Sequence, residues 1–81
     1  MRGNKKEREK LAKILSDALL KEDVTKKHFA EFMGIKPDNM YKYLRSEVFP
    51  TYDDFEKIYT YLGYTFDELF DMVVEPIHSR R

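Results

Sequence analysis

The side chains best suited to chemistry in this chain are the cations and amides between residues 25 and 46. Two short segments, each with both polar and apolar residues, flank Gly34. The first contains Lys26, and the second contains Lys42 and Arg45. Ammonium and guanidinium groups bind phosphate oxygens, and they also donate hydrogen bonds to base edges in the major groove of DNA. This basic edge therefore favours recognition of a nucleic acid over making or breaking of a bond.

Residue patterns typical of catalysis or metal binding are missing. The 81 residues include no cysteine, so a disulfide framework and a thiolate metal site are excluded. His28 and His78 lie far apart in the chain, with no carboxylate at ligand spacing, so we expect no metal site. No nucleophile has a neighbouring base in a recognisable arrangement, and no glycine-rich phosphate loop is present. The sequence therefore predicts no enzyme, no cofactor and no small-molecule substrate.

Charge is unevenly distributed along a chain whose formal net charge is zero. Residues 1–46 hold twelve Lys or Arg and seven Asp or Glu, whereas residues 47–79 hold one lysine and eight acids. DNA binding requires a local basic face that displaces counterions, not a basic average over the molecule. We therefore expect the acidic half to face away from any bound phosphates.

Apolar residues recur at helical spacing throughout, and no alternating run indicates a strand, so the predicted fold class is all-α. The first helix is predicted from about Asn4 to Lys21, and residues 1–7 are a polar N-terminal end. The polar segment as far as Lys10 is interpreted as a frayed or extended helix start. The apolar stripe of this helix consists of Leu11, Ile14, Leu15, Ala18 and Leu19.

Two short helices follow around one glycine. Thr25 is placed as an N-cap, so the second helix begins at Lys26, and Gly34 ends it. Pro37 suits the first turn of a third helix that runs to about Arg45. So short a connection forces the helices to cross steeply, which is typical of a helix-turn-helix. The apolar pattern of the second helix comprises Phe29, Ala30, Phe32 and Met33.

Two further helix starts complete the predicted single domain of residues 1–81. Thr51 and Thr65 each precede an acid by three residues, and the second pair forms a true capping box. Gly63 ends the fourth helix and Pro76 closes the fifth, which leaves residues 75–81 as a C-terminal tail. The inward faces are predicted to comprise Phe55, Ile58, Tyr59 and Leu62, then Phe66, Leu69, Phe70 and Val73.

Over about residues 8–71 the chain resembles the phage repressor/Cro-type, or XRE-like, helix-turn-helix DNA-binding family. The resemblance implies a compact five-helix, lambda-repressor-like domain in which helices two and three form the helix-turn-helix. It also implies a sequence-specific transcriptional regulator, a repressor, that binds double-stranded DNA as a homodimer. The matching residues are Phe29-Ala30, Met33-Gly34-Ile35, Met40, Tyr43, Pro50-Thr51, Ile58, Leu62-Gly63-Tyr64-Thr65 and Asp67-Glu68-Leu69-Phe70.

The family's third helix enters the major groove, and the resemblance carries its site onto this chain position by position. The implied base-reading residues are Pro37, Asp38, Asn39, Tyr41 and Lys42. The implied phosphate contacts are Lys26, Lys27, Arg45 and Ser46. The chain departs from the family pattern at Lys26 in place of glutamine, Lys36 in place of a Ser or Thr N-cap, and Ser46 in place of glycine.

A second function stays open beside the regulator. In it the helix-turn-helix serves mainly protein–protein contact, as in an antitoxin or anti-regulator whose acidic half engages a basic partner. No apolar run approaches the roughly 20 residues needed to cross a bilayer, and no signal peptide is present, so a soluble cytoplasmic protein is expected. Apolar material for the dimer interface is predicted at Met72, Val73, Val74, Pro76 and Ile77.

Overall fold

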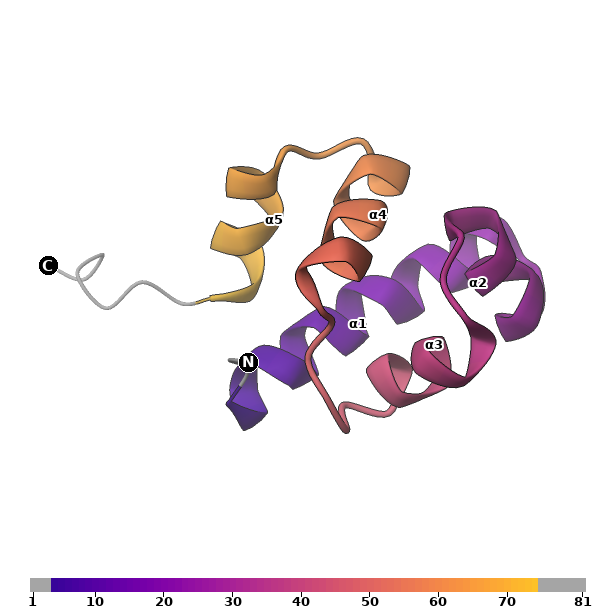
Figure 1. The fold of residues 1–81 in the computed structure, drawn as a ribbon, viewed down its shortest axis with the longest axis horizontal. Helices are drawn as coiled ribbons and strands as arrows, with labels where there is room; N and C mark the ends of the chain where they lie inside the picture. Colours follow the sequence, from indigo (N-terminus) through magenta and orange to yellow (C-terminus); the bar gives the residue numbers. More distant parts are fainter. Residues whose placement is uncertain (1–3, 75–81) are drawn as a thin grey trace, which may run out of the picture.

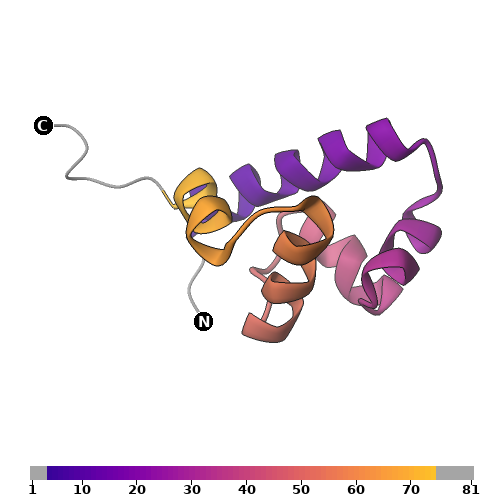
Figure 2. The ribbon, with the colours of Figure 1, turned by 90° about the horizontal axis from the view of Figure 1, so that it is seen from above.

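The computed structural model describes residues 4–74, which form five helices and no strand. The predicted all-α class is thus confirmed for this part of the chain. In Figures 1 and 2 the long helix α1 extends along one side of the molecule, and the shorter helices lie against it. The elements in chain order are α1 (Lys5–Glu22), α2 (Lys26–Met33), α3 (Pro37–Leu44), α4 (Tyr52–Leu62) and α5 (Phe66–Val73).

Helix α1 connects the two ends of the molecule. It contacts α2 and α3, most extensively α3, and it also contacts α5. Helix α4 packs against both α2 and α5, so it occupies the middle of the arrangement (Figure 1). The α2–α3 pair is therefore supported from two sides, by α1 and by α4.

The first turn of α1 is capped, so of the two predicted alternatives, a frayed or an extended helix start, the structure has the extended one. The Glu7 backbone N–H donates to Asn4 Oδ1 at 2.9 Å, and the Asn4 N–H donates to Glu7 Oε1 at 3.3 Å. Glu7 is also buried. This reciprocal capping box satisfies two backbone donors that would otherwise lack partners. Residues 4–10 therefore belong to the folded domain, and the helix continues to Glu22, one residue beyond its predicted end.

Local capping chemistry sets the bounds of the other helices. Thr25, Thr51 and Thr65 each accept a hydrogen bond from the backbone N–H three residues on, as predicted. Gly34 and Gly63 take left-handed conformations at the ends of α2 and α4, which glycine adopts without a Cβ penalty.

The end of α5 differs from the prediction. The Thr65 capping box is confirmed, with the Thr65 N–H donating to Glu68 Oε1 at 2.9 Å. The helix ends at Val73, earlier than the predicted closure by Pro76, and residue 76 lies outside the described residues.

The core draws on all five helices and on the turn between α2 and α3. Phe32, which belongs to the apolar pattern predicted for α2, is 55% exposed, because the buried face of this helix is formed by Phe29, Ala30 and Met33. Val73 is fully buried, so it cannot supply the predicted dimer surface. The core residues are Leu11, Leu15, Phe29, Ala30, Met33, Ile35, Met40, Tyr43, Phe55, Ile58, Leu69 and Val73.

Candidate nucleic-acid interface

The connection between α2 and α3 is a tight turn of three residues, 34–36. The Ile35 N–H donates to the Ala30 carbonyl at 3.0 Å, and the Ile35 side chain is buried. Lys57 of α4 donates from Nζ to the Gly34 carbonyl at 3.1 Å. The relative placement of α2 and α3 is therefore fixed by backbone hydrogen bonds, by an apolar anchor and by a lysine from a third helix.

Helix α3 has distinct inner and outer faces. Met40 and Tyr43 are buried against the core, whereas Asp38, Lys42 and Arg45 are exposed. Residues separated by three or four positions share one side of a helix, so these three form a single outward face. The other predicted base readers are half-buried, at the start of the helix or along its edges: Pro37, Asn39 and Tyr41.

The charges at the start of α3 are only partly compensated. Lys36 occupies the N-cap position and its side chain makes no capping hydrogen bond. Asp38 lies in the first turn, where its carboxylate favours the positive end of the helix dipole. Among residues 4–74 no ion pair joins Asp38 to Lys42, although they are four positions apart. Lys42 is exposed on the outer face of α3.

The predicted phosphate contacts differ in whether an acid of residues 4–74 pairs with them. Lys26 and Lys27 are exposed in the first turn of α2, directly after the N-cap Thr25. Arg45, at the end of α3, is engaged by an acid that sequence reasoning did not single out. Its Nε lies 2.7 Å from Oε2 of Glu47. This hydrogen bond with Arg45 lowers the pKa of Glu47 and raises the pKa of Arg45.

Ser46 has an unusual backbone at the end of α3. Its φ of 64° is left-handed, a region that non-glycine residues rarely adopt. Its N–H donates to the Tyr43 carbonyl at 3.1 Å, and its carbonyl accepts from Arg8 Nε at 2.9 Å. Because both backbone groups are engaged, a phosphate contact at this position would use the Ser46 hydroxyl.

Two buried polar side chains hold α3 against α4. Tyr43 donates from its hydroxyl to Asp54 Oδ2 at 2.5 Å, and both residues are buried. Burial, followed by the hydrogen bond to Asp54, raises the pKa of Tyr43. In the sequence, Tyr43 is one of the residues that carry the family resemblance, and Asp54 is the acid three residues after the N-cap Thr51. No local pattern signals this pair, because it depends on the packing of two helices.

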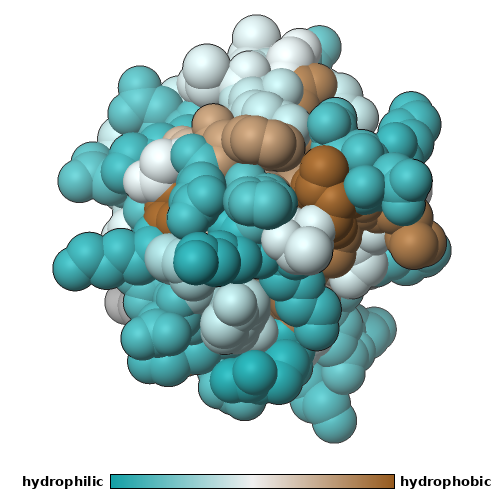
Figure 3. Space-filling view, turned by 90° about the vertical axis from the view of Figure 1, so that its right-hand side faces the viewer, coloured by the Kyte–Doolittle hydropathy of each residue, from teal (hydrophilic) through white to brown (hydrophobic). Residues whose placement is uncertain are grey.

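The end of the molecule at the right of Figure 1, where α2 lies, is mainly hydrophilic. Hydrophobic atoms interrupt this surface in separate patches (Figure 3).

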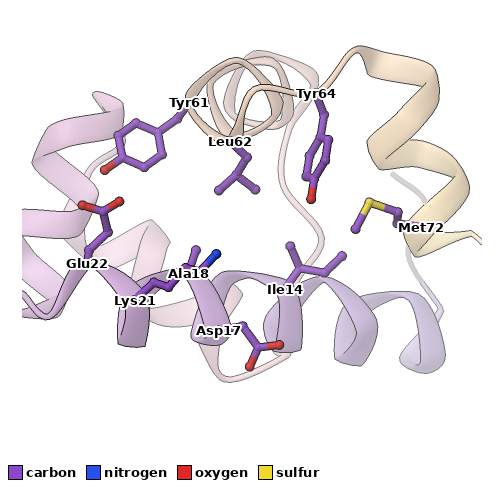
Figure 4. A pocket seen from close by; sticks show the side chains of 9 residues that line it. All are labelled: Ile14, Asp17, Ala18, Lys21, Glu22, Tyr61, Leu62, Tyr64 and Met72. Atoms are coloured by element: carbon purple, nitrogen blue, oxygen red, sulfur yellow. The ribbon is translucent and has the colours of Figure 1, made fainter.

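A cavity of about 380 Å³ lies elsewhere on the molecule, between α1 and the segments around α4 and α5 (Figure 4). Ile14, Leu62 and Met72 give it apolar walls, and Tyr61 points its hydroxyl toward the carboxylate of Glu22 (Figure 4). Burial, followed by the charge of Glu22, raises the pKa of Tyr61. None of the predicted base-reading or phosphate-contacting residues lines this cavity.

Comparison of the chain with protein families, curated proteins and solved structures found no match. Within residues 4–74 no group of three or more His, Asp or Glu is placed to hold a metal ion, and His78 lies outside that range. No helix in the same range has the length and apolarity needed to cross a membrane. The candidate site consists of the outer face of α3 and the lysines at the start of α2, because these exposed residues supply the cations of the predicted interface.

Proposed function

We propose that this chain is a sequence-specific DNA-binding transcriptional regulator, a repressor of the lambda-repressor-like type, in which α2 and α3 form a helix-turn-helix. One observation carries the proposal: α3 is held by its buried face while Asp38, Lys42 and Arg45 extend outward together. A major groove about 12 Å wide admits one α-helix in this orientation. The proposal also rests on the family resemblance of the sequence.

Each outward residue has a defined chemical role in this proposal. The Lys42 ammonium donates to guanine O6 and N7, and the Asn39 amide pairs with adenine N6 and N7. Asp38 accepts only, and its partner is the cytosine N4 amino group. Pro37 and Tyr41 border these readers, and the remaining residues contact the phosphate backbone: Lys26, Lys27, Arg45 and Ser46.

The regulator acts as a homodimer, with α3 of each protomer in successive major grooves of a pseudo-palindromic site. The two half-sites would then be separated by about 34–36 Å, one helical turn of DNA. Sedimentation of the free protein and of its DNA complex measures the stoichiometry. One protomer per bound site at saturation would contradict the dimer.

Selection of bound duplexes from a random pool tests specificity and symmetry together. A palindromic consensus is expected, and affinity for random duplex should fall by orders of magnitude between about 50 and 200 mM salt, because bound counterions are released. Circular dichroism on the same sample verifies that the protein is folded. A folded protein that retards no duplex at about 50 mM salt is not a DNA-binding regulator.

The second candidate is a domain that binds a basic protein partner. It is favoured by the exposed acids on α4 and α5, which face solvent on the part of the chain that has a net negative charge. Those exposed acids are Asp53, Glu56, Asp67, Glu68 and Asp71. This candidate predicts that charge-neutralising substitutions on α5 abolish complex formation with a basic protein, whereas Lys42→Ala leaves that complex intact.

A further inference from the structure

The turn after α3 fixes the position of Glu47. The Ser46 N–H donates to the Tyr43 carbonyl at 3.1 Å, and the Glu47 N–H donates to the Lys42 carbonyl at 2.9 Å. This pair of hydrogen bonds, with a left-handed residue between, is the Schellman motif that ends many helices. Arg8 of α1 clamps the turn through the Ser46 carbonyl. The backbone of Glu47 is thus held immediately beside the end of α3.

The carboxylate of Glu47 pairs with the guanidinium of Arg45, which the proposed interface needs for phosphate contact. Oε2 of Glu47 lies 2.7 Å from Nε of Arg45, and the two side chains remain 48% and 58% exposed. Lys42 also lowers the pKa of Glu47 through its charge. A carboxylate oxygen and a phosphate oxygen accept the same charge-assisted hydrogen bonds from arginine, at similar distances. Glu47 therefore presents to Arg45 the chemistry that a DNA phosphate would present.

We propose that Glu47 competes with the DNA backbone for Arg45. The Glu47 carboxylate holds the Arg45 guanidinium until a DNA phosphate displaces it. This inference rests on the proposed function and adds a control to the same site. A loosely bound duplex gains little from Arg45, because its phosphate must first separate Arg45 from Glu47. A duplex docked in register places a phosphate at Arg45 and displaces the carboxylate. Glu47 thereby lowers affinity for random DNA.

Glu47→Gln tests the competitor directly. The probe is a fluorescein-labelled duplex of random sequence, with anisotropy measured across a range of salt concentrations. The variant should bind about tenfold more tightly near 100 mM salt, and the slope of log affinity against log salt should steepen by about one, the contribution of one added phosphate contact. Asp71→Asn on α5 is the matched control, because it removes the same charge from an exposed residue of a helix that does not form the proposed interface. It should change the affinity much less, since salt screens distant charges.

A double-mutant cycle with Arg45→Gln separates competition from general repulsion. If Glu47 acts through Arg45, the gain from Glu47→Gln should drop to about threefold or less once Arg45 is replaced. Equal gains in both backgrounds would overturn the proposal, because Glu47 would then only repel phosphates. No gain in the wild-type background would overturn it too. Thermal unfolding of all four proteins checks that the exposed substitutions leave the fold intact.

The same samples distinguish failure of this inference from failure of the proposed function. Wild-type binding without a gain in Glu47→Gln rejects the competitor and retains the DNA-binding function. Binding by Glu47→Gln alone supports the competitor strongly. Absence of binding by either protein rejects both. An NMR titration of the free protein gives a further measure: the Glu47 pKa should lie below its usual range and rise in Arg45→Gln, and an unchanged pKa in that variant would contradict the pairing.

Discussion

The Tyr43 hydroxyl donates a 2.5 Å hydrogen bond to Asp54 and thereby joins α3 to α4 inside the core. The same carboxylate lies 4.0 Å from Lys57, whose ammonium reaches the Gly34 carbonyl in the turn before α3. Buried hydrogen bonds of this kind fix the rotation of a helix about its axis, because a donor left unpaired in the core is costly. The direction in which Lys42 points is therefore determined by residues on the opposite side of α3.

Tyr43→Phe should lower the free energy of unfolding by about 1–3 kcal/mol, because it leaves the Asp54 carboxylate buried without its donor. Urea denaturation measures the change. Tyr41→Phe is the control, since Tyr41 is half-buried at the edge of the outer face and its change should stay within about 0.5 kcal/mol. Equal stability of Tyr43→Phe and the wild type would show that the bond contributes nothing.

Alkaline pH should lower the free energy of unfolding more in the wild type than in Tyr43→Phe. The folded state raises the Tyr43 pKa, so above about pH 10 the unfolded chain loses this proton first. The contribution of Tyr43 is therefore complete below about pH 10 and decreases above it, with a slope of up to about 1.4 kcal/mol per pH unit. Tyr59 and Tyr61, whose pKa values are also raised, respond in both proteins. We expect the stability difference between wild type and Tyr43→Phe to narrow from pH 10 to 12; a constant difference would contradict the assignment.

Ser46→Gly should stabilise the protein by about 0.5–1 kcal/mol, because glycine adopts the left-handed conformation without strain. This gain is the strain relieved minus the greater entropic cost of ordering glycine. Ser46→Ala is the matched control: it also removes the hydroxyl yet keeps the strain, so no gain is expected. Thermal and urea unfolding measure both variants. A loss of stability in Ser46→Gly would mean that the relief of strain is smaller than the entropic cost of ordering glycine together with the loss of the serine hydroxyl.

Substitution of two lysines should separate base reading from phosphate contact. Lys42→Ala should relax sequence preference at one position of the selected site, at a cost of about 1–3 kcal/mol against the preferred base. Lys26→Ala should weaken binding to all sequences alike and reduce the salt slope by about one. Lys21→Ala is the control, because it removes the same charge from a lysine that lines the cavity and is not one of the predicted contacts. An unchanged consensus with Lys42→Ala would remove Lys42 from the base readers.

Helix starts could be predicted from the sequence because capping is a local property. Thr25, Thr51 and Thr65 each find their partner three residues on, within reach of any sequence pattern. The exposure of Phe32 could not be predicted, since it depends on which face of α2 meets α1 and α4.

The contacts that position the candidate site, and the one that engages Arg45, could not be predicted from local sequence patterns. Tyr43 and Asp54 lie 11 positions apart, and Arg8 lies 38 positions from the carbonyl of Ser46. The Arg45–Glu47 pair is close in sequence, but its geometry requires the left-handed backbone of Ser46. The base-reading roles of Asp38, Asn39 and Lys42 stay predictions, which the selection and substitution experiments test.

The two faces of α3 also bear on how such a protein can evolve. Met40 and Tyr43 hold the helix in the core, while Asp38 and Lys42 face solvent, so most exchanges on the outer face should change the folding free energy by less than about 0.5 kcal/mol. A lineage could therefore alter its outward residues one at a time without first acquiring a compensating substitution. New binding preferences would then be open to selection through single steps, each of which leaves a folded protein.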